Sequence, residues 1–90
     1  MTSKEKLWYS EEAKELSLLV EEYKDLALYH AVLGDPEVVG LLKDISNHFR
    51  EIARIYEADL DKLPEVAMRF GAIRSLQEQM NSHLESTPQT

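Results

Sequence analysis

The sequence contains no cysteine, and it has three glycines and three prolines among 90 residues. The lack of cysteine excludes disulfides, a thiolate nucleophile and a cysteine-ligated metal, so stability must come from packing or from assembly. No stretch approaches the roughly 18 apolar residues of a membrane-spanning helix, and no apolar run follows the first lysines. We therefore expect a soluble, cytoplasmic protein that does not bind membranes.

Positive charge is scarce as well. The 17 acidic residues outnumber the 10 lysines and arginines, which gives a formal net charge of −7. Such a balance makes binding to a nucleic-acid backbone an unfavourable main task. The acids crowd the first half, whereas all the arginines lie in the second half. Contacts between unlike halves of neighbouring subunits and neutralisation within one subunit both remain open.

One glycine and two prolines mark the ends of helices. Gly34 can adopt the left-handed conformation that closes a helix, Asp35 can cap the next one, and Pro36 suits a first helical position. A second break precedes Pro64. The sequence therefore predicts an all-α domain over residues 1–90, with helices at about 11–33, 36–60 and 64–84, the third shorter than the others. Ser10 is the expected cap of the first helix, residues 1–9 form an aromatic N-terminal arm, and residues 85–90 form a flexible tail.

The first predicted helix is apolar on more than one side. Leu16, Val20 and Ala27 follow helical spacing, as do further apolar residues of that stripe, and a short turn at Gly34 makes the first two helices antiparallel neighbours. Other large side chains lie off the stripe, and a domain of this size has little material to cover them. We therefore expect a homo-oligomer or docking onto a larger assembly. The expected interface residues are Trp8, Leu18, Leu28, Tyr29, Val32, Phe49 and Phe70.

Residues that could perform chemistry do not form a known catalytic pattern. Asp44, His48 and Glu51 share one face of the second helix, but a di-iron bundle uses Glu-x-x-His and this chain has the reversed order. There is no Gly-x-Ser-x-Gly motif and no phosphate-binding glycine loop. The sequence therefore predicts no enzyme, no metal and no cofactor.

A small ligand is the alternative function. Arg69 and Arg74 could receive a phosphate or a carboxylate, because arginine prefers planar bidentate partners. Tyr9 could supply a stacking ring and Lys24 a point charge, if folding or assembly brings the two together. The residues alone leave a ligand site and an ion-paired surface open.

The segment Arg69-Phe70-Gly71-Ala72-Ile73-Arg74-Ser75-Leu76 contains Gly-x-Ile-x-x-Leu. With the long helix and the acidic break before it, this stretch resembles small helical-hairpin proteins of tailed bacteriophages over roughly residues 36–84. The resemblance implies a phage-encoded interaction or virion-assembly subunit, located in the host cytoplasm or in the virion.

A second resemblance is to phage sponge proteins that sequester the cyclic nucleotides of anti-phage signalling. In that family a tyrosine near the N-terminus and a lysine one helix-length later hold the ligand, and Tyr9 and Lys24 have a compatible spacing. This resemblance implies an anti-defence role with a cyclic nucleotide as ligand. It stays beside the assembly subunit as the alternative function.

Overall fold

The structure, a computed structural model of the chain, describes residues 1–86. Three α-helices, α1 (Ser3–Val32), α2 (Pro36–Ala58) and α3 (Leu63–Ser86), contain most of these residues, and a short 3-10 helix, η1 (Leu60–Lys62), precedes α3. The predicted all-α class is confirmed. The expected flexible tail over residues 85–90 is corrected in part, because Glu85 and Ser86 belong to α3. Residues 87–90 of that tail lie outside the described residues.

Helix α1 begins at Ser3 rather than near residue 11, which is a correction of the expected cap at Ser10. Thr2 is the N-cap: its hydroxyl accepts a hydrogen bond from the Glu5 N–H at 3.2 Å, and the Glu5 carboxylate accepts one from the Thr2 N–H at 3.3 Å. This reciprocal capping box satisfies two N–H groups at the helix end. Residues 3–9, expected as an arm, are therefore the first turns of α1.

The turn between α1 and α2 has the predicted geometry. Gly34 has a φ of 79°, its N–H donates to the Ala31 carbonyl, and the Asp35 N–H donates to the His30 carbonyl, both at 3.1 Å. These two bonds form a Schellman motif, which requires a left-handed residue at the Gly34 position. Asp35 then caps α2 by accepting a hydrogen bond from the Val38 N–H at 3.4 Å.

Helix α2 ends at Ala58, and Asp59 leads into η1. The Asp59 carboxylate lies 3.3 Å from Nη1 of Arg54 and 3.7 Å from Nζ of Lys62, so it ties the end of α2 to η1. Helix α3 has 24 residues and is therefore about as long as α2, which has 23. The expectation of a shorter third helix was wrong, because the helix continues past residue 84.

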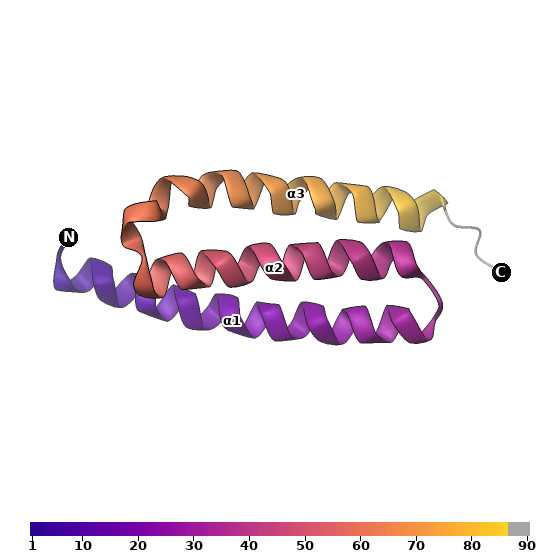
Figure 1. Ribbon diagram of the computed structural model, residues 1–90, viewed down its shortest axis with the longest axis horizontal. Coiled ribbons are helices and arrows are strands. Elements are labelled where there is room, and N and C mark those ends of the chain that lie inside the picture. The colour runs from indigo at the N-terminus through magenta and orange to yellow at the C-terminus, as the bar shows by residue number, and fades with distance from the viewer. Residues whose placement is uncertain (87–90) are drawn as a thin grey trace.

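The three helices lie side by side in a flat layer of 54 × 21 × 15 Å, with α2 between α1 and α3 (Figure 1). Consecutive helices run in opposite directions, so α1 and α3 are parallel to each other (Figure 1). No Cα atom of α1 lies within 8 Å of a Cα atom of α3. Helix α2 is thus covered on two sides, whereas α1 and α3 form the open edges of the layer.

The core is centred on α2. Val38, Ile45, Ile52 and Ile55 have no exposed surface. Two clusters form around this helix: the larger contains Ala13, Leu16, Val20, Ile45, Phe49, Ile52, Ala53, Ile55, Val66 and Ile73, and the smaller contains Ala27, Val38 and Leu42. Burial of each large apolar side chain contributes about 1.5–3 kcal/mol, so α2 anchors the other two helices.

One sequence expectation is corrected by this core. Phe49 is 7% exposed and its ring centre lies 5.5 Å from that of Tyr23, so it is a core residue and not an exposed interface anchor. Gly40 lies inside α2, and a Cβ atom placed there would have no neighbour within 4 Å. Within one chain, Gly40 therefore faces open space.

Candidate functional site

Large apolar side chains are exposed on α1 and α3, and none on α2. Of the residues expected at an interface, Trp8, Leu18, Leu28, Tyr29, Val32 and Phe70 are exposed. Sequence reasoning missed others, of which Leu26, Leu33 and Leu84 share the helical spacing of core residues. The additional exposed side chains are Met1, Leu7, Leu26, Leu33, Met68 and Leu84. Since the layer has no fourth helix to cover them within residues 1–86, the helices at its edges present this surface to solvent.

One part of this surface spans α1 and α3. The Gln77 amide of α3 donates a hydrogen bond to the Tyr23 hydroxyl of α1 at 3.1 Å, which bridges the two helices across α2. Residues three, four and seven positions away on a helix share its face, so apolar neighbours surround this bridge. We call this surface the α1/α3 face; it comprises Leu19, Tyr23, Leu26, Leu33, Phe70, Gln77, Met80 and Leu84.

Aromatic rings gather at the other end of α1. The ring centre of Tyr9 lies 4.9 Å from that of Trp8 and 5.0 Å from that of Tyr56 in α2. Burial raises the pKa of Tyr56, and the nearby Tyr9 and Glu12 add to the effect. Tyr9 thus packs on α2, which leaves the exposed part of Trp8 as the outermost member of this group.

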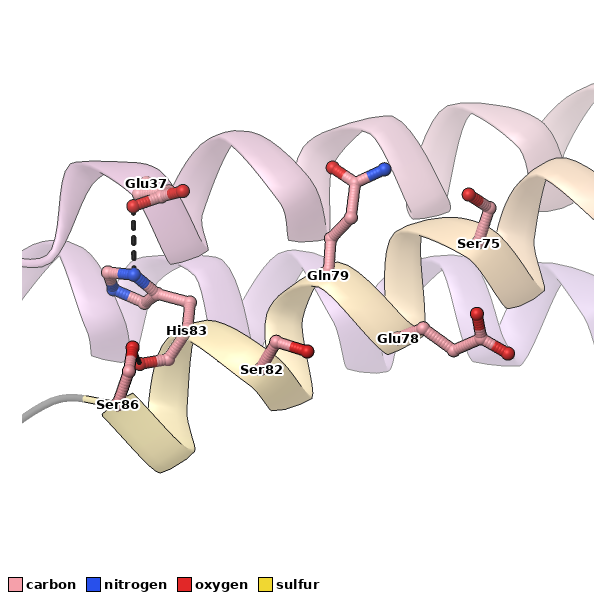
Figure 2. A pocket seen from close by; sticks show the side chains of 7 residues that line it. All are labelled: Glu37, Ser75, Glu78, Gln79, Ser82, His83 and Ser86. Carbon is pink, nitrogen blue, oxygen red and sulfur yellow. Dashed lines mark hydrogen bonds and ion pairs between the residues drawn. The ribbon is translucent and has the colours of Figure 1, made fainter.

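A polar pocket of about 630 Å³ lies between the start of α2 and the end of α3 (Figure 2). Its lining residues are Glu37, Ser75, Glu78, Gln79, Ser82, His83 and Ser86. His83 Nδ1 is 2.8 Å from a Glu37 carboxylate oxygen, and Nε2 is 3.1 Å from both oxygens of Asp35. Both ring nitrogens therefore lie within hydrogen-bond distance of carboxylates. The imidazole fastens the end of α3 to the turn before α2.

The charge of Asp35 is stabilised by these contacts. Partial burial alone would raise its pKa, but the Val38 N–H and His83 together lower it below the ordinary value. An N-cap carboxylate also lies at the positive end of the helix macrodipole. Asp35 thus serves two helices, since it caps α2 and holds α3.

Asp44, His48 and Glu51, which share a face of α2, do not act as one group. His48 Nδ1 is 3.2 Å from Nη1 of Arg69, and Glu51 forms an ion pair with Arg54. Hydrogen bonds from Arg54 lower the pKa of Glu51. Within residues 1–86, no three histidine or acidic side chains come together in a way that could hold a metal ion.

The residues expected to bind a cyclic nucleotide do not meet within one chain. Tyr9 and Lys24 are both on α1, and 15 residues of helix separate them by about 22 Å. Lys24 lies 3.6 Å from Glu21. Arg69 is held by His48 and lies 3.9 Å from Glu65, whereas Arg74 is exposed and forms no ion pair among residues 1–86. A shared pocket would need a second chain, and the ligand-binding alternative stays a prediction.

No helix in the described part of the chain is both long enough and apolar enough to cross a lipid bilayer. Comparison with protein-family models, curated proteins and solved structures finds no match to this chain. The two phage resemblances therefore stay predictions.

Proposed function

We propose that this protein is a non-enzymatic assembly subunit, which binds protein through the exposed apolar side chains of α1 and α3. One observation carries the proposal: every large apolar side chain exposed within the described helices belongs to α1, to its C-cap or to α3. Exposed apolar side chains that are scattered singly need no explanation, but a concentration of them marks an interaction surface. Helix α2 supplies the core, and its two neighbours supply the contacts.

The charges of the chain suit this division. The exposed side of α2 carries Lys43, Asn47, Arg50 and Arg54, which keep that face hydrated. The net charge of −7 limits non-specific association of a protein with so much apolar surface. Binding then depends on complementary shape and charge rather than on non-specific hydrophobic association.

The proposed setting is a phage-encoded subunit of virion structure or assembly, as the first resemblance implies. Its contribution would be structural, through aromatic anchors such as Trp8, Tyr29 and Phe70. Aromatic side chains supply the largest contact area for each ordered residue and dominate the energetics of many interfaces.

Site-specific photo-crosslinking in the native cell tests the proposal. A benzophenone amino acid is placed at Tyr29 or at Phe70, where it replaces an exposed aromatic ring with a larger one. The matched control has the same amino acid at Asn47, an exposed position on α2. We expect protein adducts from positions 29 and 70 and few from position 47. Equal labelling at all three positions, or no protein adduct at 29 and 70, would overturn the proposal.

A further inference from the structure

The α1/α3 face carries a seven-residue repeat on both of its helices. On α1, Leu19 and Leu26 are spaced by seven residues, and the C-cap residue Leu33 follows after seven more. On α3, Phe70, Gln77 and Leu84 are also spaced by seven residues, and Met80 lies between Gln77 and Leu84. A heptad repeat keeps the same seam turned toward a helical partner along its whole length. The face is therefore patterned for a helix, and not for a globular surface.

Charges of opposite sign flank the two seams. Glu15 and Glu22 each precede a seam leucine by four residues, so they lie beside Leu19 and Leu26 on α1. Arg74 follows Phe70 by four residues and precedes Gln77 by three, so it lies beside the seam of α3. All three charged side chains are exposed, and none forms an ion pair within residues 1–86. One chain thus offers acids on one edge of the face and a base on the other.

We propose that the occupant of the α1/α3 face is a second copy of this chain, related by a two-fold axis parallel to the helices. This inference rests on the function proposed above and names the partner of the same surface. Such an axis stacks the two faces and exchanges their edges, so α1 of each copy packs in parallel on α3 of the other. The apolar side chains of the two α1/α3 faces are then enclosed between the layers of a six-helix dimer.

Charge selects this arrangement over the other face-to-face dimer. A two-fold axis perpendicular to the helices would place α1 on the partner's α1, so that acids such as Glu15 and Glu22 face an equally acidic helix. The parallel axis instead brings the acids of α1 to the arginine of α3. The Tyr23–Gln77 hydrogen bond shows that these two residues lie at the same position along the parallel axes of α1 and α3. With this alignment, Arg74 and the partner's Glu22 lie within about 3 Å of each other along the helix axis. The dimer therefore contains two symmetric Arg74–Glu22 ion pairs.

Charge reversal tests the dimer by sedimentation equilibrium. Arg74→Glu and Glu22→Arg each convert both ion pairs into like-charge contacts, and we expect each to raise the dissociation constant about tenfold. The double variant should return to within about twofold of the original value. Arg50→Glu makes the same change in net charge on the exposed side of α2 and serves as the control, with little expected effect. A dimer equally weakened by Arg50→Glu, or one that the double variant fails to restore, would overturn this geometry.

Mapping of crosslinks on the otherwise unchanged chain avoids variants that could fold poorly. A benzophenone at position 70 should label α1 of a second copy near Leu16, which lies at the same level. Labels on the partner's α3 would overturn the parallel arrangement. If position 70 labels only a different protein, the second copy is overturned while the assembly function stands. If neither position 29 nor position 70 labels any protein, the assembly function itself fails.

Discussion

The Tyr23 hydroxyl accepts a hydrogen bond from the Gln77 side chain, 54 residues later in the chain. The bond connects two helices whose Cα atoms stay more than 8 Å apart. Gln77 is the polar member of an otherwise apolar heptad seam, and Tyr23 packs its ring on Phe49 beneath it. This pair therefore fixes the position of α3 relative to α1 along the helix axes. Apolar contacts alone would allow the two helices to slide along each other.

A double-mutant cycle should measure this interaction. Tyr23→Phe leaves the Gln77 amide without its acceptor, and we expect a loss of about 0.5–1.5 kcal/mol in the free energy of unfolding. Gln77→Leu leaves the partly buried Tyr23 hydroxyl without its donor and should cost a similar amount. The combined variant should be nearly as stable as the original, since both polar groups are replaced by apolar ones. Urea unfolding of the four proteins at one protein concentration gives the coupling energy, and strictly additive losses would contradict the prediction.

The order of helices was predictable because the signals that end them are local. Gly34, Asp35 and Pro36 each favour one backbone geometry, and the structure uses all three as the sequence predicts. The start of α1 was not predicted, since Thr2 and Ser10 are equally good caps and the choice depends on Glu5, which completes the capping box at Thr2. Where two residues are equally good N-caps, a further contact selects between them, here the one between Thr2 and Glu5.

Two glycines should respond to alanine in opposite directions. Gly34→Ala places a Cβ atom at a φ of 79°, where an L-residue is strained by about 1–2 kcal/mol. Gly40→Ala places it in open space inside α2, where alanine favours the helix by about 1 kcal/mol over glycine. Thermal unfolding should show a lower melting temperature for the first variant and a higher one for the second. A lower melting temperature for Gly40→Ala would mean that a partner's backbone occupies that site.

Burial was harder to predict than the helices themselves. Leu26 and Leu33 share helical spacing with buried residues of α1, yet both are exposed. Phe49 was expected at an interface and lies in the core. Periodicity identifies which residues share a face, but the flat arrangement decides how far round each helix the core extends. That arrangement depends on the packing of α3 beside α2, which no single helix encodes.

Truncation of matched leucines separates these two environments. Leu42 is 1% exposed and Leu28 is 67% exposed. Leu42→Ala leaves a cavity beside Ala27 and Val38 and should lower the free energy of unfolding by about 2–5 kcal/mol. Leu28→Ala should change it by no more than about 0.5 kcal/mol, because the side chain is already hydrated. Equal losses from the two variants in denaturant titrations would contradict the assignment of Leu28 to the surface.

The hydrogen bonds that Asp35 forms with the Val38 N–H and with His83 should make the free energy of unfolding depend on pH in the acidic range. The folded state lowers the Asp35 pKa, so the unfolded state binds a proton more readily. The stabilising contribution is therefore complete above the ordinary pKa of aspartate and disappears as pH falls through the lower, folded pKa. Asp35→Asn preserves an N-cap side chain but removes the charge, so it isolates this contribution. We expect the stability difference between the two proteins to be largest near neutral pH and to shrink below about pH 4.

The matched control is Asp44→Asn, which removes an exposed carboxylate from the same helix. The stability difference caused by this variant should stay small throughout the titration. Hydrogen exchange locates the effect. Relative to the original protein at neutral pH, Asp35→Asn should accelerate amides in the last turns of α3 more than those near Val66, because His83 has lost one of the two carboxylates that it contacts within residues 1–86. Uniform acceleration along α3 would mean that Asp35 acts only through the cap of α2, and not by holding the end of α3.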